Sequence, residues 1–435
     1  MWGKRAVQKI GRMTQESIRQ VGTKKASKSA GSKSEALMEM EKKFAARIYD
    51  PIPVVIAEGK GCIVKDADGA RYLDFLGGYA SVNTGHCHPK IVAAVQNQVM
   101  KLHQVSRAFY NSELPVFAEY ITRYFNYDRV IPMNTGVEGG DTAIKMARKW
   151  GYLSKGIPEN QAIVVFPIGN FWGRSTSAIS TSNNPTSFEH YGPYMPGFGL
   201  VPYDNVCALE EVLQNKNVCA YMMEPIQGEG GVIVPSDGYL KEVRRLCSKY
   251  NVLFIADEVQ TGLGRTGALL ACDHECVRPD ILVLGKGLAG AVTPMSAVLA
   301  NEEIMCHMTP GSHGSTYGGN PFACALARKT LEVILEECLI ENARKMGEKL
   351  RAELKCKLPK VMVPAIRGKG LMNAIEIHPD FASAHDLCLR MKECGLLAKS
   401  ATGQSIRLTP PLVITEEEME EGIEIITKAV HSFAK

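Results

Sequence analysis

The fold class is indicated by the stretch Val252-Leu253-Phe254-Ile255-Ala256-Asp257 together with Ile281-Leu282-Val283-Leu284-Gly285-Lys286. Each is a continuous apolar run followed by a charged residue. Such runs, alternating with helical patterns, are typical of parallel strands with helices on both faces of the sheet. Ligands of these sheets bind at the carboxyl ends of the strands. We therefore expect Asp257 and Lys286 to lie at one edge of one sheet.

A lysine at the end of a buried strand carries a desolvation cost, so its presence suggests a requirement. A pyridoxal-phosphate (PLP) enzyme has that requirement. It needs a lysine amine that forms a Schiff base with the cofactor and a carboxylate that keeps the pyridinium nitrogen protonated. The alternative for Asp257 and Lys286 alone is a structural ion pair, and the surrounding segments favour the cofactor site.

The composition limits the classes of partner. The chain has 435 residues, 45% of them hydrophobic and 22% charged, and a formal net charge of +4. This charge gives no reason to expect nucleic acid or a membrane surface as partner, and no apolar stretch approaches the roughly 20 residues that span a bilayer. The 13 cysteines are scattered, which indicates reduced thiols. The clusters 85–88 and 272–276 lack a spaced second half, so we predict no metal site.

Residues 1–34 form a basic leader with a single acid, Glu16. A basic, acid-poor segment that contains serine is typical of a transit peptide and favours the mitochondrial matrix. A disordered tail on a cytoplasmic protein is the alternative. Three further segments are predicted: 35–90, an N-terminal segment that contributes to the small domain; 91–332, a large PLP-binding α/β domain; and 333–435, a small C-terminal α+β domain.

Apolar runs and helical periodicity predict the elements along the chain. The predicted strands are 162–166, 218–223, 252–256, 281–284, 296–300, 374–377 and 405–408, and the predicted helices are 142–153, 238–250, 329–354 and 415–433. Together they predict an α/β fold, with a mostly parallel central sheet in the large domain and a smaller α+β domain.

The glycine-rich segment Asn134–Asp141 precedes the first of these helices. Small residues let a phosphate approach the backbone, and the free N–H groups of a helix N-terminus bind it. A glycine-rich turn without a ligand is the alternative. Glu138 and Asp141 would repel a phosphate unless their side chains point away.

Phe171 and Arg174 follow the strand 162–166. An aromatic side chain there can stack on a flat ring, and an arginine can bind a carboxylate through two parallel hydrogen bonds. A packed aromatic beside a surface arginine is the alternative. The loops 224–231, 257–262 and 311–320 also combine glycines with carboxylates or hydroxyls, and so many such loops in order are hard to explain as chance.

The segment Gly285–Gly290 fits Gly-x-Gly-x-x-Gly, the dinucleotide-binding fingerprint, which a helix should follow directly. Pro294 and the predicted strand 296–300 follow instead. We therefore do not expect a nicotinamide cofactor.

The segment 257–267 (DEVQTGLGRTG), followed by Lys286, resembles the signature of the class III (ω) aminotransferases. The resemblance covers nearly the whole chain from about Tyr49 and includes 49–55 (YDPIPVV), 74–79, 85–90 (GHCHPK) and 407–412 (RLTPPL). It is closest to the members of this family that act on ornithine. It implies a PLP-dependent transferase of fold type I that is active as a homodimer or dimer-based oligomer with shared active sites.

The resemblance also implies a role for each site residue. Lys286 and Asp257 are catalytic: one binds PLP covalently and the other pairs with its ring nitrogen. The other cofactor-binding residues are Gly136 and Val137 at the phosphate, Phe171 on the ring, Gln260 at the phenolic oxygen, and Ser315 and Thr316, which reach the phosphate from the neighbouring subunit. The substrate-binding residues are Arg174 and Arg407 for carboxylates, Glu229, which covers Arg407 in the ornithine half-reaction, and Tyr49 and Tyr79, which favour ornithine. Gly139 and Asp141 depart from the family's usual alanine and glutamate.

By this resemblance the chain transfers the δ-amino group of L-ornithine to 2-oxoglutarate and yields glutamate 5-semialdehyde and glutamate. Acetylornithine and 4-aminobutyrate aminotransferases share the cofactor set and are the nearest alternatives. A binding protein that keeps the fold is an alternative of another class, against which Lys286 and both arginines speak. A PLP mutase or decarboxylase would form no glutamate from 2-oxoglutarate.

Overall fold

The computed structural model describes residues 32–434, which form two compact units. Among these residues the smaller unit comprises 32–59 and 63–72, with α2 (Lys33–Phe44), most of β1 (Ile56–Lys60) and β2 (Ile63–Asp66). Ser32 caps α2: its hydroxyl accepts a hydrogen bond from Glu35 N, and its own N–H donates to the Glu35 carboxylate. The predicted leader lies outside the described residues except for its last three, and the predicted domain boundaries remain predictions.

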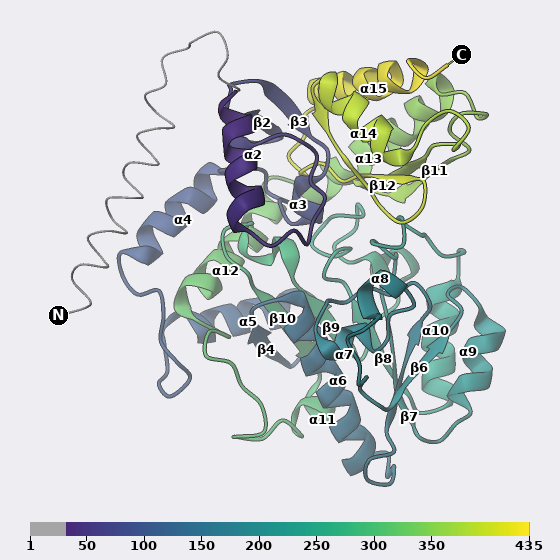
Figure 1. The fold of residues 1–435 in the computed structure, drawn as a ribbon. Helices are drawn as coiled ribbons and strands as arrows, with labels where there is room; N and C mark the ends of the chain where they lie inside the picture. The colour runs from purple at the N-terminus through teal and green to yellow at the C-terminus, as the bar shows by residue number, and fades with distance from the viewer. Residues whose placement is uncertain (1–31, 435) are drawn as a thin grey trace. The chain divides into compact units, whose positions relative to one another are not determined.

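The larger unit contains a seven-stranded sheet in the order β4-β10-β9-β8-β7-β5-β6 (Figure 1). Its strands are β4 (Arg129–Met133), β5 (Ile163–Pro167), β6 (Phe198–Val201), β7 (Val218–Met223), β8 (Leu253–Asp257), β9 (Ile281–Leu284) and β10 (Ser296–Ala300). Neighbouring strands from β9 to β6 are parallel, while β10 runs antiparallel to both β9 and β4. The mostly parallel sheet confirms the predicted fold class, and β7, β9 and β10 have the predicted bounds.

Helices cover both faces of this sheet, which explains why its central strands are apolar at every position. Helix α6 (Gly136–Leu153) packs on one face, where Ile144 and Ile255 share a core cluster. Helices α9 (Val206–Leu213) and α10 (Tyr239–Lys249) pack on the other face, where Phe254 and Leu246 share a second cluster. Because alternate residues of β8 enter opposite cores, polar groups gather at the strand ends.

Two predicted helices differ from the structure. Helix α6 begins at Gly136 rather than at 142, because a capping box holds it there: the Thr135 hydroxyl accepts from Glu138 N, and the Glu138 carboxylate accepts from Thr135 N. The single helix predicted at 329–354 is wrong. The chain forms α12 (Pro321–Glu336) and α13 (Leu339–Lys357), and Cys338 between them has φ +52°, a left-handed conformation that ends a right-handed helix.

The C-terminal part of the larger unit is built around a second sheet, in the order β11-β12-β15-β14 and antiparallel throughout. Its strands are β11 (Ala365–Lys369), β12 (Met372–Glu376), β14 (Lys399–Ser400) and β15 (Ser405–Leu408). Helices α13, α14 (Ala384–Glu393) and α15 (Glu416–His431) pack around it. Strand β13 (Leu396–Leu397) pairs in parallel with the end of β3 (Arg71–Asp74).

The remaining elements of the larger unit are short or peripheral. They are α3 (Gly77–Ala80), α4 (Pro89–Val99), α5 (Glu113–Phe125), α7 (Thr176–Ile179), α8 (Pro185–Phe188), α11 (Glu302–Met305) and the 3₁₀ turns η1 (Ala271–Glu275) and η2 (Lys286–Ala289). Lys286 is thus the first residue of a 3₁₀ turn directly after β9.

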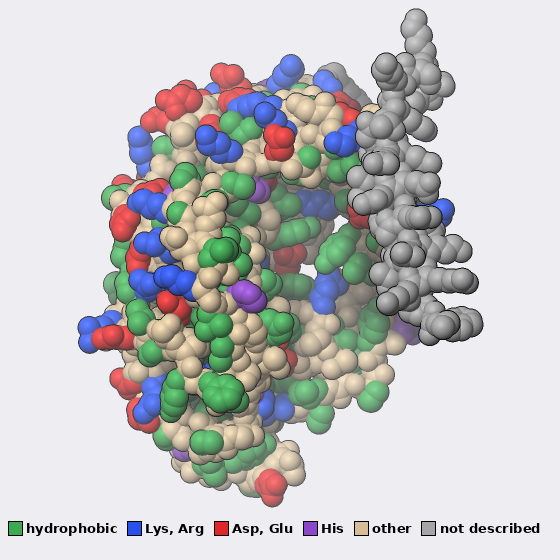
Figure 2. All heavy atoms as spheres, turned by 90° about the vertical axis from the view of Figure 1, so that its left-hand side faces the viewer, with side chains coloured by type: hydrophobic (Ala, Val, Ile, Leu, Met, Phe, Trp, Pro, Cys, Tyr) green, Lys and Arg blue, Asp and Glu red, His purple; other side chains and the backbone are tan. Residues whose placement is uncertain are grey.

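The surface carries charges of both signs. On the face shown in Figure 2, acidic and basic side chains are interspersed. Within residues 32–434, no helix combines the length and the apolarity that crossing a bilayer requires. In the same part of the chain no three His, Cys, Asp or Glu side chains gather as a metal site; His86 instead hydrogen-bonds Asp74, and His274 the hydroxyl of Thr266.

Candidate active site

Asp257 and Lys286 lie at the same edge of the central sheet. Strands β8 and β9 are adjacent and parallel, and Asp257, the last residue of β8, lies opposite Val283 of β9. Lys286 follows β9 through Gly285 and has φ +43°, a conformation uncommon for a residue with a side chain. Strain of this kind gathers at functional sites. Within residues 32–434, the Lys286 amine has no hydrogen-bond or ion-pair partner.

The surroundings of Lys286 favour a neutral amine. Burial lowers the pKa of Lys286 from its ordinary 10.5 to about 8, and the Arg407 charge acts in the same direction. The carboxylates of Glu229, Glu224 and Asp257 oppose this lowering. Because only the neutral amine is a nucleophile, Lys286 is reactive at a lower pH than an exposed lysine.

The two carboxyl groups nearest to this edge resist ionisation. Burial raises the pKa of Asp257 to about 6, although the Val259 N–H, which donates to it at 3.0 Å, and Lys286 oppose the change. Burial, followed by the charge of Asp257, raises the pKa of Glu224 to about 8. An added cation would favour the ionised form of Asp257. The edge is therefore suited to a ligand that directs a positive group at Asp257.

The N-terminus of α6 has the features of a phosphate site. The N–H groups of Gly136 and Val137 have no acceptor among the described residues. A Cβ on Gly136 would lie 2.9 Å from Val259 Cγ1, so glycine lets this helix end approach the end of β8 closely. Free N–H groups and the positive end of the helix dipole attract an anion.

The acidic side chains of this segment are engaged elsewhere. The Glu138 carboxylate turns back and accepts hydrogen bonds from the N–H groups of Asn134, at 2.8 Å, and Thr135, at 3.2 Å. Asp141 accepts a 2.5 Å hydrogen bond from Ser177 Oγ. The capping box thus explains where the Glu138 carboxylate points. Asp141, where this chain departs from the family's usual glutamate, has a hydroxyl partner.

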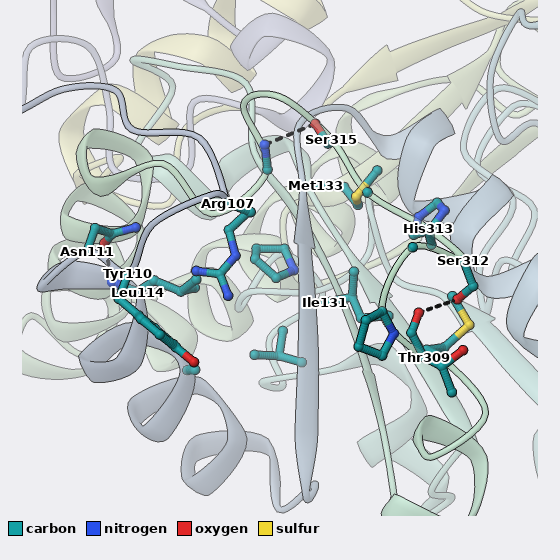
Figure 3. Close-up of a pocket in the computed structure, with 18 of the residues that line it drawn as sticks. Arg107, Tyr110, Asn111, Leu114, Ile131, Met133, Thr309, Ser312, His313 and Ser315 are labelled. Carbon is teal, nitrogen blue, oxygen red and sulfur yellow. Dashed lines mark hydrogen bonds between the residues drawn. The ribbon is translucent and has the colours of Figure 1, made fainter.

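Ser315 lies in the loop 311–320, and its hydroxyl is already hydrogen-bonded within this chain. Asn134 Nδ2 donates to Ser315 Oγ at 2.8 Å. Gly318 N donates to the same oxygen at 3.0 Å (Figure 3). Thr316 is exposed, and Gln104 donates to its carbonyl oxygen at 2.7 Å. These contacts bring the loop to the segment before α6. The role of Ser315 and Thr316 at a neighbouring subunit's phosphate stays a prediction.

A cavity of about 740 Å³ adjoins this loop and is distinct from the Lys286 edge. It is lined by residues of β4 and of the segments 107–118 and 308–318, among them Arg107, Ile131 and Ser315 (Figure 3). No residue of the catalytic pair lines it. This cavity is therefore not where the reactive groups converge.

Phe171 and Gln260 lie at the same sheet edge as the catalytic pair. Phe171 N donates to Glu224 Oε1 at 3.0 Å, which holds the segment after β5 beside the end of β7. Gln260 is 6% exposed, and its Oε1 has no partner among the described residues. A Cβ on Gly228 would lie 2.1 Å from that oxygen. A buried amide without a partner is costly, and a polar group of a ligand would satisfy it.

Arg174 is exposed near the phosphate end. Its guanidinium lies 5.7 Å from the Phe171 ring centroid, and no carboxylate of residues 32–434 pairs with it. Gly173, with φ +150°, packs so closely that its Cβ would lie 2.4 Å from Val137 Cγ2. The structure thus brings Arg174 to the residues of the predicted phosphate site.

Arg407 and Glu229 form a partly buried ion pair. Arg407 Nη1 and Nη2 donate to the two carboxylate oxygens of Glu229 at 2.8 and 3.0 Å. The Arg407 side chain is 1% exposed and that of Glu229 is 33% exposed. Burial raises the pKa of Glu229, but the hydrogen bonds and charge of Arg407 outweigh burial, and the net pKa is below its ordinary value. The Glu229 carboxylate is therefore ionised near neutral pH.

The two tyrosines predicted to favour ornithine have different surroundings. Tyr79 has φ +58°, and its ring centroid lies 5.3 Å from the Arg407 guanidinium, so it lies beside the Glu229–Arg407 pair. Tyr49 is 74% exposed and belongs to the smaller unit. Its role stays a prediction.

Glu224 is a site residue that the sequence placed at a strand end but to which sequence reasoning gave no role. It is 6% exposed and accepts hydrogen bonds from Phe171 N and Gly228 N, each at 3.0 Å. It therefore holds two loops of the site together. The signal was its position directly after β7, close to the position of Asp257 at the end of the adjacent strand β8.

These groups together fit PLP. The reactive Lys286 amine suits an aldehyde, Asp257 suits a protonated ring nitrogen, and the unpartnered N–H groups of Gly136 and Val137 suit a phosphate. The unsatisfied amide of Gln260 suits a polar ring substituent. A lysine and a carboxylate at adjacent strand ends, beside a helix N-terminus, define the site of a PLP-dependent transferase.

Residues 44–430 match the aminotransferase class-III family, and the chain belongs to that family. It is 59% identical over 403 residues to a Drosophila melanogaster protein named ornithine aminotransferase, mitochondrial, and 93% of each chain is covered. A solved ornithine aminotransferase structure from Toxoplasma gondii, which reveals partial occupancy of PLP at its active site, has a TM-score of 0.92 at 44% identity, with 96% of this chain and 97% of that chain covered. A solved acetylornithine aminotransferase from Elizabethkingia anophelis has a TM-score of 0.84 at 48% identity, with 92% and 99% covered.

Proposed function

We propose that this chain is a PLP-dependent ornithine δ-aminotransferase, which converts L-ornithine and 2-oxoglutarate into glutamate 5-semialdehyde and glutamate. The proposal is supported by membership of the aminotransferase class-III family, by the 59% identity to a protein named ornithine aminotransferase and by the geometry of the site. The observation that carries the proposal is the bidentate Glu229–Arg407 pair, because it masks a carboxylate-binding arginine with an internal carboxylate.

The two substrates need this masking. Ornithine presents its distal amine for reaction, whereas glutamate presents the amine next to a carboxylate. When ornithine reacts, Glu229 neutralises Arg407, so that no substrate carboxylate is drawn there. When 2-oxoglutarate binds, its carboxylate replaces Glu229 on Arg407. An arginine fork binds either carboxylate with the same two parallel hydrogen bonds.

Bound PLP supplies an aldehyde that condenses with amines and a ring that accepts the electron pair left when a proton leaves carbon. The Lys286 Nζ, whose pKa burial lowers to about 8 so that a larger fraction is neutral than for an exposed lysine, would remove that proton and return it two atoms away, in a 1,3-shift. Asp257, as an anion, holds the proton of the ring nitrogen. Gly136 and Val137 bind the phosphate through their N–H groups.

We assign the remaining predicted residues to orientation. Phe171 packs on the ring, and Gln260 satisfies its amide on the phenolic oxygen. Arg174 binds the substrate carboxylate at the opposite end from Arg407. Tyr79 gives ornithine a polar partner next to Arg407, which a 4-aminobutyrate enzyme does not need. Positioning groups of this kind convert binding energy into rate because they hold the reacting atoms in line.

We also assign the chain to a homodimer or a dimer-based oligomer with shared active sites. Large apolar side chains are exposed in the segment 100–110, with Met100 85%, Phe109 72% and Tyr110 95% exposed, and Tyr110 lines the same cavity as Ser315. Exposed apolar groups at this density mark an interface. A second copy that covers them would bring its Ser315 and Thr316 to the phosphate. Sedimentation at micromolar concentration tests this assembly, and a monomer that is fully active would exclude it.

The favoured location is the mitochondrial matrix, with the cytoplasm as the alternative. The Drosophila melanogaster relative is named mitochondrial, and residues 1–34 have the composition of a transit peptide. A fluorescent protein fused to residues 1–34 is expected to enter mitochondria. A diffuse cytoplasmic signal would favour the alternative.

A panel of amino donors tests the substrate. The purified protein is supplied with PLP and 2-oxoglutarate and assayed with ornithine, N-acetylornithine and 4-aminobutyrate. We expect the highest kcat/KM for ornithine. The 48% identity to an acetylornithine aminotransferase makes N-acetylornithine the second candidate, and a higher kcat/KM for it would overturn the assignment. Lys286→Ala is the matched control and is expected to lose both turnover and the visible absorbance of the bound cofactor.

A further inference from the structure

The turn that carries Glu229 is held by its backbone on both sides of the side chain. Before Glu229, Gly228 N donates to Glu224 Oε2 at 3.0 Å. At Glu229 itself, the carbonyl oxygen accepts a 2.8 Å hydrogen bond from Thr402 Oγ1. Thr402 precedes β15, the strand that carries Arg407. The turn is therefore joined to the same part of the fold as the arginine that Glu229 covers.

After Glu229, the turn is held by hydrogen bonds from the guanidinium of one arginine. Arg367 of β11 donates to the Gly231 carbonyl oxygen from Nε at 3.0 Å and from Nη2 at 2.8 Å. The same guanidinium donates to Ser405 Oγ at 2.6 Å and pairs with Glu376 Oε2 at 2.8 Å. Its orientation is thus determined by residues on β12, which pairs with β11, and on β15, the next strand of the same sheet.

Close packing leaves the turn little room to move. Gly231 has φ +105°, and its Cβ would lie 3.0 Å from Ser405 Oγ and 3.2 Å from Arg367 Nη2. At the other end, a Cβ on Gly228 would meet Gln260 Oε1 at 2.1 Å. Because the backbone is confined at both ends, the step that uncovers Arg407 has to be a rotation of the Glu229 side chain alone.

We infer that Arg367 is a positioning residue that holds the Glu229 carboxylate over Arg407 and thereby sets the preference between the two amino donors. The inference rests on the proposed function, because it concerns the same Glu229 switch. Arg367 has no hydrogen bond to Arg407 or Lys286, so it acts only through the turn. Without it, Gly231 loses both of its guanidinium donors, the turn gains freedom, and the Glu229–Arg407 pair becomes a smaller fraction of the population.

The test compares two donors with the same form of the holoenzyme. Ornithine and glutamate each convert the PLP form to the aminated form, and the change in visible absorbance gives kcat/KM for each half-reaction. In Arg367→Met, Arg407 is uncovered more often, so glutamate gains and ornithine loses. We expect the ornithine-to-glutamate ratio of kcat/KM to fall about tenfold, the effect of a coupling within one hydrogen-bond network. Arg367→Lys, with one cationic centre in place of the fork, is expected to restore part of the ratio.

Arg351→Met is the matched control. Arg351 also donates to a backbone carbonyl of this region, Gly370 O at 3.0 Å, and to Asn373 Oδ1 at 2.6 Å, but it does not contact the Glu229 turn. We expect it to change both half-reactions by the same factor. In a Glu229→Ala background, Arg367→Met is expected to change the ratio less than about twofold, because the group it positions is gone.

A ratio that is unchanged in Arg367→Met, or that falls equally with and without Glu229, overturns the inference. If Arg367→Met does not fold, Thr402→Val decides, because Thr402 is exposed and its hydroxyl bonds Glu229 directly. It is expected to lower the ratio about threefold, and no change overturns the inference. Failure of the proposed function and failure of the role of Arg367 give different results. If the parent protein does not use ornithine, the proposed function fails; if it does and the ratio is insensitive, only the role of Arg367 fails.

Discussion

The charges around Lys286 predict that two substitutions in the Glu229–Arg407 ion pair shift the pKa of Lys286 in opposite directions. Glu229 raises the pKa of Lys286 and Arg407 lowers it, against a background of burial that brings it to about 8. Glu229→Gln removes the anion and leaves the Arg407 cation, so the Lys286 pKa is expected to fall. Arg407→Met removes the cation and leaves the anion, so the Lys286 pKa is expected to rise.

The magnitude follows from the titration of one amine. With a pKa of about 8, roughly one Lys286 in ten is neutral at pH 7, against about one in 3,000 for an ordinary lysine. Each substitution is expected to move the pKa by about 1, the lower end of the effect of one nearby charge. The difference from 10.5 corresponds to about 3 kcal/mol. Between pH 8 and 10.5 the unfolded chain binds more protons, so the stability of the cofactor-free protein rises with pH there.

The assay is the rate at which cofactor-free protein captures PLP between pH 6.5 and 9.5, followed by visible absorbance. Ionisation of PLP itself is common to all variants, so differences in midpoint report Lys286. Glu353→Gln is the control, because Glu353 is similarly exposed, at 31% against 33% for Glu229, and pairs with Lys357 away from the site. A parent midpoint near 10, or two variants that move in the same direction, would refute the electrostatic reasoning.

Two further predictions concern the loops of the site. Gly228→Ala adds a methyl group only 2.1 Å from the present position of Gln260 Oε1, so the affinity for PLP is expected to fall at least about tenfold while the fold is kept. The control is Gly199→Ala, whose Cβ would make only an ordinary 3.5 Å contact. Equal PLP affinities of the two variants in a titration would contradict this prediction. The pKa of Glu224, about 8 when folded, lies above its ordinary 4.5, so the cofactor-free protein binds more protons when folded and loses stability as pH rises from 4.5 to 8. Glu224→Gln is expected to flatten that slope in urea unfolding at pH 5 and pH 8, and an unaltered slope would show that Glu224 ionises normally.

Much of the fold could be read from local pattern. The apolar runs at 218–223, 281–284 and 296–300 are strands with those bounds, because a strand buried on both faces has no polar position inside it. The same reasoning placed Asp257 and Lys286 at one edge, since adjacent parallel strands end together. The helix predicted at 329–354 was wrong because the backbone turns left-handed at Cys338 and ends one helix before the next begins.

The candidate site likewise has features that the sequence predicted and features that it could not predict. Residue types that follow strands were identifiable one by one, including Phe171 and Gln260, since each lies within a few residues of an apolar run. The repulsion expected from Glu138 did not materialise because the side chain caps its own helix. That outcome depends on a rotamer, which a pattern of residue types does not specify.

The sequence alone predicted a parallel sheet with an acid and an amine at neighbouring strand ends, because the burial and the polarity of a strand are local properties. Which charges face one another came from the folded arrangement. Glu229 and Arg407 are far apart in the chain and 2.8 Å apart in space, and Arg367 reaches Gly231 from another sheet. Ion pairing and burial act over a few ångströms, so their consequences, including the reactivity of Lys286, arise only when distant segments are brought together.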